Sequence, residues 1–277
     1  MLTASQLKSF LRDHQLRLTK RLGQHHLIDP HAVARIIEAC RLVSTETVVE
    51  IGAGLGALTE PLAARAGRVV AVEIDRRICE LLAERMRPFR NVEVRHGDIL
   101  DFPWADVPGA TAVGAIPYHI TSPILVALSE QRRALRQAVL VLQDEVALRL
   151  LARPGTKAYG RLSILAQYCW EVTSLLSVPR RAFFPQPEVG SRCIRLMPRE
   201  RTAVQVRDEA MFFDVVKRAF AHRRKTLVNC LSDSDAFSRV QAEAAVGALG
   251  HPASIRGEAL TLEQFASLAS ALASSQQ

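Results

Sequence analysis

The residues best suited to chemistry in this sequence are three glycines at alternate positions, Gly52, Gly54 and Gly56, which follow a β-branched run containing the acid Glu50. This pattern predicts a strand, a tight turn and a helix, and the missing Cβ atoms let the backbone approach a ligand closely. The helix N-terminus adds unpaired N–H groups and a partial positive charge. Because the spacing G-x-G-x-G differs from the dinucleotide pattern G-x-G-x-x-G, we expect a nucleotide-type cofactor, with a ligand-free turn as the alternative.

Polar groups also follow the next predicted strands. Glu73 lies at the end of the strand 68–74, Asp98 follows the strand 91–95, and I-P-Y follows the strand 111–115. In a doubly wound sheet, ligands bind outside the carboxyl ends of the strands. An acid about twenty residues past the glycine turn suits ribose hydroxyls, and Asp98 can accept a hydrogen bond from an exocyclic amine such as that of adenine. Each acid alone is more often a helix cap, but acids at successive strand ends favour a ligand site.

The elements that position these groups alternate along the first half of the chain. Strands are expected at 47–51, 68–74, 91–95, 111–115 and 138–143, and helices at 57–66, 76–87, 123–130 and 144–152. An earlier helix is expected to begin at Asp29 and Pro30, as N-cap and first residue, and to run to about residue 42; Ser122 and Pro123 repeat that pattern. Such alternation predicts a parallel sheet with right-handed crossovers.

The second half of the chain changes character. A glycine-bounded loop (153–160) and a helix (161–170) precede two strands, 171–178 and 190–197, separated by F-F-P-Q-P-E-V-G-S, which suits an antiparallel hairpin at the sheet edge. The remaining pattern is helical, at 206–221, 223–231, 238–248 and 261–273. We therefore predict two domains, residues 1–200 and 201–277.

Bulk properties exclude several classes of protein. A hydrophobic content of 48% with 23% charged residues indicates a globular chain, and no apolar run approaches a membrane span or a secretory signal. The five cysteines are scattered and lack C-x-x-C spacing, which favours reduced thiols in the cytoplasm and argues against a zinc site. The net charge of +8 favours a polyanionic partner, with nucleic acid ahead of a membrane surface.

Basic residues gather in clusters that could contact phosphates. The clusters are Arg17, Lys20 and Arg21; Arg132, Arg133 and Arg136; and His222, Arg223, Arg224 and Lys225, with Lys157 and Tyr159 in the glycine-bounded loop as further candidates. A solvated helix face is the more common explanation of a charge run, but the net charge favours nucleic-acid contacts here.

Several segments resemble a known family. E-I-G-A-G-L-G-A-L-T, V-E-I-D, G-D-I-L and I-P-Y-H-I-T-S-P resemble the successive motifs of S-adenosylmethionine-dependent methyltransferases that act on exocyclic amines. The resemblance narrows to the small-subunit rRNA adenine-N6,N6-dimethyltransferases through L-G-Q-H-H-L, Q-D-E-V-A-L-R, P-G-T-K-A-Y-G-R-L-S, F-F-P-Q-P-E-V-G-S, A-F-A-H-R-R-K-T-L and L-T-L-E-Q-F. Together these segments run in the family's order over nearly the whole chain.

The resemblance implies an α/β fold, a Rossmann-like seven-stranded methyltransferase sheet that is mostly parallel with an antiparallel edge strand, and a small all-helical C-terminal domain. It implies S-adenosylmethionine as cofactor, bound by Gln24, His25, Leu27, Gly52, Gly54, Glu73, Asp98 and Ala115. It places the chemistry at Ala115, Ile116, Pro117, Tyr118 and Phe183, with the target adenine between Tyr118 and Phe183. A core anchor beside the prolines is the alternative for Phe183 and Phe184.

The chain departs from the family pattern at three positions. Ala115 stands where the family carries the Asn of N-[LI]-P-Y, whose side-chain amide helps to align the target amine. His26 replaces a usual Phe, and Asp144 replaces a frequent Lys near a face expected to meet RNA. Because alanine offers no side-chain acceptor, we expect cofactor binding to survive and methyl transfer to be slow.

The resemblance also implies the partners, small-subunit rRNA and the immature small ribosomal subunit, for a cytoplasmic monomer that binds no membrane. Arg132, Arg133, Lys157, Arg223, Arg224 and Lys225 are the candidate RNA-binding residues. A ribosome-assembly or RNA-binding factor that kept the fold and lost catalysis is the main alternative, and a resistance-type methyltransferase acting on large-subunit rRNA is another. The glycine spacing and I-P-Y-H disfavour a nicotinamide oxidoreductase.

Overall fold

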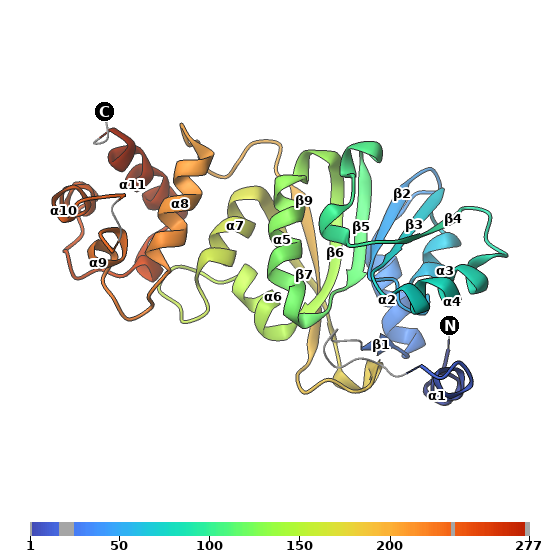
Figure 1. Cartoon of the computed structure of the whole chain (residues 1–277). Helices are drawn as coiled ribbons and strands as arrows, with labels where there is room; N and C mark the ends of the chain where they lie inside the picture. Colours follow the sequence, from blue (N-terminus) through green and yellow to red (C-terminus); the bar gives the residue numbers. More distant parts are fainter. Residues whose placement is uncertain (1, 17–24, 234–235, 275–277) are drawn as a thin grey trace. The chain divides into compact units, whose positions relative to one another are not determined.

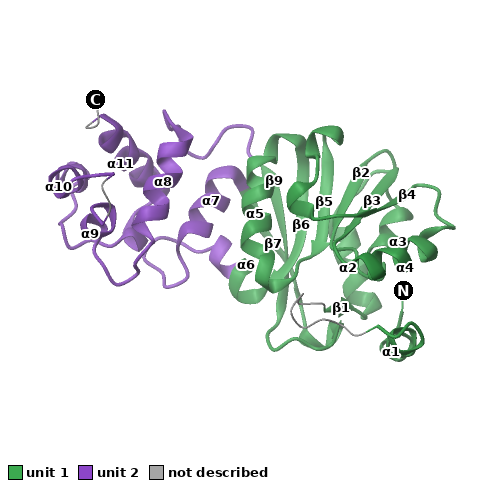
Figure 2. Cartoon of the chain, in the orientation of Figure 1, with its two compact units in different colours: residues 1–147, 171–198 green, residues 148–170, 199–277 purple. Residues whose placement is uncertain are grey.

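The computed structural model describes residues 2–16, 25–233 and 236–274 of the chain (Figure 1). The chain divides into two compact units, Met1–Ala147 with Glu171–Pro198 and Leu148–Trp170 with Arg199–Gln277 (Figure 2). The division after Pro198 lies close to the predicted domain boundary. The segment 148–170, which we expected in the first domain, clusters with the helical unit instead.

The first unit is organised around a seven-stranded sheet in the order β4-β3-β2-β5-β6-β9-β7. The strands are β2 (Thr47–Ile51), β3 (Arg68–Glu73), β4 (Val92–His96), β5 (Ala110–Ala115), β6 (Leu135–Gln143), β7 (Trp170–Val178) and β9 (Ser191–Pro198). Pairing is parallel from β4 through β6 and antiparallel between β6 and β9. The mostly parallel sheet is as predicted, but the antiparallel strand β9 lies between β6 and β7 and not at the edge.

The central strands β2, β3, β5 and β6 are buried on both faces, as their β-branched runs predict for a parallel sheet covered by helices, whereas β4 is only partly buried. Val48, Val49, Val69 and Val70 are fully buried. The helices of this part are α1 (Ala4–Asp13), α2 (Pro30–Ala39), α3 (Thr59–Ala63), α4 (Arg76–Met86), α5 (Thr121–Glu130) and α6 (Asp144–Leu150). Side chains of α2 and α3 share one core cluster with β2 and β3, while α4 packs against β3 and β4.

The helix starts follow local capping chemistry. The Asp29 carboxylate accepts a hydrogen bond from the His31 N–H at 2.9 Å, and Pro30 is the first residue of α2, both as predicted. Asp75 caps α4 in the same way. The prediction that Ser122 caps a helix beginning at Pro123 is wrong, because α5 begins at Thr121 directly after a short 3-10 turn, η4 (Tyr118–Ile120).

A second, two-stranded sheet joins β1 (His26–Leu27) to β8 (Phe183–Phe184). The pairing is antiparallel, with His26 opposite Phe184 and Leu27 opposite Phe183. Leu27 and Phe183 belong to the same core cluster as the α2 side chains. This pairing brings His26 and Leu27 next to the two phenylalanines that open the proline-rich segment, which the sequence analysis did not predict.

The helical unit contains α7 (Arg161–Cys169), α8 (Glu209–Ala219), α9 (Leu227–Leu231), α10 (Arg239–Ala248) and α11 (Leu262–Ser274). Tyr168 stacks on Phe212 with ring centroids 5.0 Å apart, and this buried aromatic pair explains why α7 clusters with α8. The helix α8 is shorter than predicted, because Asp208 caps it, and residues 222–225 form a turn before α9. None of the described helices has the length and apolar character to cross a bilayer.

Candidate active site

One cavity of the first unit lies at the carboxyl ends of the parallel strands. Its walls include every predicted cofactor-binding or catalytic residue that the structure describes: His25, Leu27, Gly52, Gly54, Glu73, Asp98, Ala115, Ile116, Pro117, Tyr118 and Phe183. Gln24 lies outside the described residues. The cavity is also lined by residues that the sequence analysis did not assign to the site, including Glu50, Ile74, Leu100 and Ser191.

The glycine turn forms one wall. Gly52 and Gly54 have positive φ angles of 67° and 55°, a conformation that favours glycine. A Cβ on Gly52 would meet no described atom within 4 Å, whereas a Cβ on Gly54 would lie 3.1 Å from His26 Nδ1. The turn is therefore open at Gly52 and covered by the His26 ring at Gly54.

Glu73 is held in place by the backbone around it. Its Oε2 accepts a hydrogen bond from the Gly54 N–H at 2.8 Å, and its Oε1 accepts one from the Asp75 N–H at 2.9 Å. Burial raises the pKa of this carboxyl group, while the backbone hydrogen bonds oppose the shift. Each carboxylate oxygen can accept a second hydrogen bond, so the oriented group can still bind a pair of hydroxyls.

Asp98 was considered either as a helix cap or as an acid of the ligand site, and the structure shows it in both positions. Its Oδ1 accepts a hydrogen bond from the Leu100 N–H at 3.0 Å and caps the 3-10 turn η2 (Ile99–Asp101), and the same residue lines the cavity.

Glu50 is a buried acid whose place in the site the sequence analysis missed. It is 2% exposed, lines the cavity and accepts a hydrogen bond from Thr59 Oγ1 at 2.5 Å. Burial raises its pKa to about 8, with Thr59 opposing the shift and the charge of Glu73 adding to it. An acid inside an apolar buried strand was the signal that could have identified it.

The segment after β5 presents backbone groups to the cavity. The Ile116 N–H donates to the Val141 carbonyl at 3.0 Å. The Pro117 carbonyl accepts from both the Ile120 N–H and Thr121 Oγ1, each at 3.2 Å. Across the described residues, no donor is bonded to the Ile116 carbonyl. Ala115 and Ile116 both line the cavity, where Ala115 adds only a methyl group.

Tyr118 presents a fixed aromatic ring to the cavity. Its hydroxyl hydrogen-bonds Ser191 Oγ at 2.9 Å, and burial raises its pKa. Phe183, the other predicted partner of the base, is only 5% exposed and packs against Leu27 in the core, so the core-anchor interpretation holds for it even though it lines the cavity. Phe184 is half-buried, with Lys8 Nζ 5.2 Å from its ring centroid.

The histidine pair at the start of β1 differs in environment. His25 Nδ1 lies 2.7 Å from the Pro185 carbonyl oxygen. His26 is half-buried, and its Nε2 is buried with no hydrogen-bond partner in the described part of the chain. Burial lowers the pKa of His26 to about 4, with a smaller contribution from the charge of His25.

Among the predicted RNA-binding residues of the first unit, some are exposed and others are bonded within the protein. Arg133 is exposed, while Arg132 donates to the Ser129 carbonyl at 2.9 Å. Arg136 forms an ion pair with Glu46 and donates to the Cys40 carbonyl at 3.3 Å, so it stabilises the fold. Asp144, expected to lower the positive charge of an RNA face, is paired with Arg192 at 2.7 Å. Arg17, Lys20 and Arg21 lie outside the described residues.

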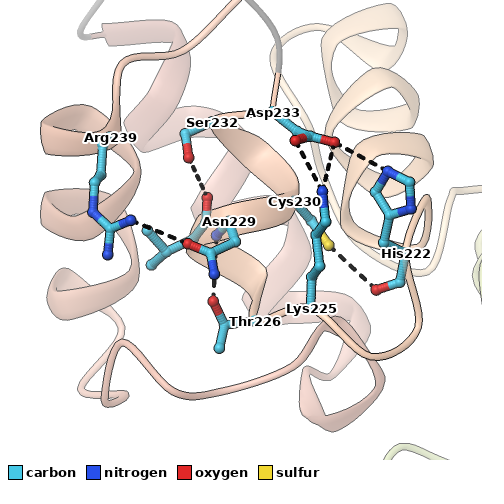
Figure 3. A network of polar contacts seen from close by, with 9 residues as sticks. His222, Lys225, Thr226, Asn229, Cys230, Ser232, Asp233 and Arg239 are labelled. Atoms are coloured by element: carbon cyan, nitrogen blue, oxygen red, sulfur yellow. Dashed lines mark hydrogen bonds and ion pairs between the residues drawn. The ribbon is translucent and has the colours of Figure 1, made fainter.

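The basic turn of the helical unit is partly neutralised. Figure 3 shows Asp233 in contact with both Lys225 and His222, at distances of 2.9 and 3.0 Å. The hydrogen bond and the charge of Lys225 hold the pKa of Asp233 below its usual value. Arg224 is exposed beside this pair.

The glycine-bounded loop contributes less to this surface than predicted. Arg223 donates to the Lys157 carbonyl and lies 3.9 Å from Glu258, while the Lys157 residue is exposed. Tyr159 is only 3% exposed and packs edge-on against Phe220, so the prediction that it reaches RNA is wrong.

The cysteines and acids outside this cavity show no second reactive centre. All five cysteines are buried thiols. Among the residues that the structure describes, no group of three or more His, Cys, Asp and Glu side chains is placed to hold a metal ion.

The sheet with one reversed strand, and a cavity bounded by a glycine turn and strand-end acids, define the class as Rossmann-like methyltransferases. The family model for ribosomal RNA adenine dimethylases matches residues 15–272. The chain therefore belongs to the ribosomal RNA adenine dimethylase family, which confirms the resemblance found in the motifs.

Named relatives agree with this membership. The chain is 42% identical to ribosomal RNA small subunit methyltransferase A of Geobacillus kaustophilus over 98% of this chain and 96% of the relative. It is 41% identical to the protein of the same name from Bacillus mycoides, with the same coverage. Among solved structures, a dimethyladenosine transferase from Plasmodium falciparum superposes with a TM-score of 0.74 at 27% identity, covering 88% of this chain and 96% of that chain. The 23S rRNA methyltransferase ErmE gives 0.66 at 30% identity, covering 89% and 99%.

Proposed function

We propose that this protein transfers methyl groups from S-adenosylmethionine to the N6 amines of adjacent adenosines in small-subunit rRNA during ribosome maturation. The observation that carries the proposal is the single cavity that joins the glycine turn, Glu73 and Asp98 to the segment Ala115–Tyr118. The relatives named as small-subunit methyltransferases support the choice of rRNA.

The residues present fit this methyl donor. Glu73 keeps acceptor capacity for ribose hydroxyls because each of its two oxygens can accept more than one hydrogen bond. Asp98 offers an acceptor for the adenine amine, and the open side of Gly52 leaves room for the methionine end beside His25 and Leu27. When bound, the donor supplies an electrophilic methyl group on a sulfonium centre.

The target base needs a flat partner and a flipped conformation. Tyr118 offers its ring, which Ser191 holds in place through the 2.9 Å hydrogen bond. Stacking on an aromatic ring stabilises a bound base by about 1–3 kcal/mol without choosing its sequence. A structured rRNA loop must turn its adenosines out of the stack to reach this cavity.

Ala115 weakens the alignment of the amine in this proposal. The Ile116 carbonyl remains as an acceptor, but the side-chain amide of the motif is missing. By analogy with other preorganised polar groups, its loss costs about 3–4 kcal/mol, which is about 100- to 1000-fold in rate. Cofactor affinity is expected to persist, because Ala115 removes none of the contacts made by Glu73.

The test is transfer of labelled methyl groups to undermethylated small subunits. Ala115→Asn should raise turnover. Ala115→Leu is the control: leucine is close to asparagine in size but has no hydrogen-bond acceptor, so turnover should not rise. High wild-type activity that Ala115→Asn leaves unchanged would contradict the mechanism. Absence of transfer by the wild-type protein and by Ala115→Asn, with cofactor and RNA binding intact, would favour the alternative of an assembly factor that kept the fold.

The exposed basic residues Arg133, Lys157 and Arg224 suit contacts with rRNA phosphates. We propose a cytoplasmic monomer that binds the immature small subunit. Its RNA affinity should fall steeply as salt is raised, because phosphate contacts release counterions. A flat salt response would count against this surface.

A further inference from the structure

His25 is fixed beside the proposed target site in one tautomer. Its Nδ1 lies 2.7 Å from the Pro185 carbonyl oxygen, and a carbonyl oxygen only accepts hydrogen bonds. Nδ1 must therefore carry the hydrogen. In the neutral ring this leaves Nε2 without a hydrogen, as an acceptor.

The same ring belongs to the wall where the target amine would be held. The His25 and Tyr118 rings lie 5.5 Å apart between centroids and are tilted by 31°. His25 lines the cavity together with Ala115 and Ile116. In the described part of the chain, the Pro185 contact is the sole hydrogen bond of His25. His25 thus brings an imidazole ring to the cavity that Ala115 lines with only a methyl group.

We propose that His25 is a catalytic residue whose Nε2 accepts a proton from the target adenine amine. This inference rests on the proposed function, which assigned His25 only to the wall around the methyl donor. The Pro185 carbonyl acts as the positioning group, because it holds the ring in the tautomer that can accept.

The proton balance of methylation requires such an acceptor or a water molecule. As the amine nitrogen bonds to the methyl carbon, the carbon–sulfur bond breaks, its electron pair stays on sulfur, and the positive charge passes to nitrogen. The methylated amine then holds one surplus proton, which moves to His25 Nε2 and gives an imidazolium that donates from both nitrogens. Release of that proton to water restores the acceptor before the next transfer.

Other titratable groups line the same cavity, including Glu73 and Asp98. His26, on β1, has a buried Nε2 without a described partner, and the Tyr118 hydroxyl is already bonded to Ser191. Glu50 is 2% exposed and is bonded to Thr59, while His119 belongs to the same cavity wall as Tyr118. His25 is the group with both a ring against Tyr118 and a fixed acceptor nitrogen.

The matched variant is His25→Asn, which keeps a side-chain donor near the Pro185 carbonyl and removes the Nε2 acceptor. General-base catalysis contributes about 100- to 10,000-fold, so kcat measured at saturating S-adenosylmethionine should fall by at least about 100-fold. The Kd for S-adenosylmethionine, measured in parallel, separates this effect from the position of the ring beside the donor. Ala115→Asn should raise kcat by a larger factor in the His25→Asn background than in the wild-type protein, because His25 Nε2 and the amide introduced by Ala115→Asn act on the same amine. An unchanged kcat, or a loss matched by weaker cofactor binding, overturns the proposal.

A second measurement does not depend on turnover. In protein labelled with ¹⁵N-histidine, assigned by comparison with His25→Asn, Nε2 of His25 should resonate as the unprotonated nitrogen of a neutral ring. It should shift when an RNA hairpin with two adjacent adenosines is added in the presence of S-adenosylhomocysteine. The opposite tautomer, or no shift with bound RNA, overturns the proposal. If the wild-type protein transfers methyl groups and His25→Asn does so equally well, this inference is refuted and the proposed function stands. If neither the wild-type protein nor Ala115→Asn transfers methyl groups, the proposed function is refuted together with this inference.

Discussion

Replacing His26 by Phe, the residue usual in the family, should make the protein more resistant to acid. The His26 pKa is lowered from 6.5 to about 4 in the folded protein, chiefly by burial. Between these values the unfolded chain binds a proton that the folded chain does not, so stability is lost as the pH falls through this window. At pH 5 the loss amounts to about 2 kcal/mol, taken as 1.5 pH units at about 1.4 kcal/mol each.

The effect of His26→Phe on the free energy of unfolding also has two opposing contributions that do not depend on pH. Removing the unpartnered Nε2 recovers about 1–3 kcal/mol of desolvation cost, while the larger ring beside Gly54 introduces strain of about 1–3 kcal/mol. Neither term changes with pH. The quantity to compare is therefore the free energy of unfolding of His26→Phe minus that of the wild-type protein, at pH 5 and again at pH 8.

The assay is equilibrium urea unfolding of both proteins at the two pH values. The stability difference in favour of His26→Phe should be about 2 kcal/mol greater at pH 5. The carboxyl groups titrate in both proteins and largely cancel. Tyr159→Phe is the control, because the Tyr159 pKa, raised to about 12 by burial, lies far above this range. Equal differences at the two pH values, or a larger one at pH 8, would refute the assigned environment of His26.

Three further perturbations test other parts of the structure. Glu50→Gln should gain stability relative to the wild-type protein as the pH rises from about 4.5 to about 8. Over that range the folded wild-type protein binds a proton at Glu50 that its unfolded chain releases. Urea unfolding at pH 5 and pH 8 measures the difference, and a relative gain toward low pH would contradict the prediction. Gly114→Ala should destabilise by about 1–3 kcal/mol, because its Cβ would lie 2.7 Å from the Ile51 carbonyl; thermal unfolding should show no such loss for Gly190→Ala, where a Cβ meets no described atom within 4 Å. Arg224→Gln should weaken RNA binding and reduce the slope of log affinity against log salt concentration by about 1. Lys225→Gln should have a smaller effect on the affinity and on the slope, because Asp233 already pairs with Lys225. Equal effects of the two variants would contradict this prediction.

The parts of the site predicted from the sequence are those that local patterns determine. Strand periodicity and the cap at Asp29 located the main elements, and parallel strands bring their carboxyl ends to one edge regardless of the loops between them. Gly52, Glu73 and Asp98 were therefore expected together, and one cavity includes them all. The motif order identified the family because it extends along the whole chain.

The parts that were missed depend on contacts between distant segments. The β1–β8 pairing joins two strands of two residues each, too short to give a periodic signal, yet it sets the positions of His25 and His26. The loop containing Tyr159 is polar and rich in turn residues, but the ring is buried against Phe220. Burial by tertiary packing, which no local pattern records, decided the environment of these residues.

The charge distribution offers a physical account of how one protein can bind two ligands of opposite charge. The chain as a whole carries a net charge of +8, which suits polyanionic RNA. The described walls of the cavity instead include the acids Glu73 and Asp98 and no lysine or arginine. Such walls favour a cationic methyl donor, and they disfavour entry of a phosphate because like charges repel across a weakly screened site. An uncharged adenine can enter where its own backbone cannot, so under the proposed function the carboxyl groups assigned to the donor would also help to admit the base alone.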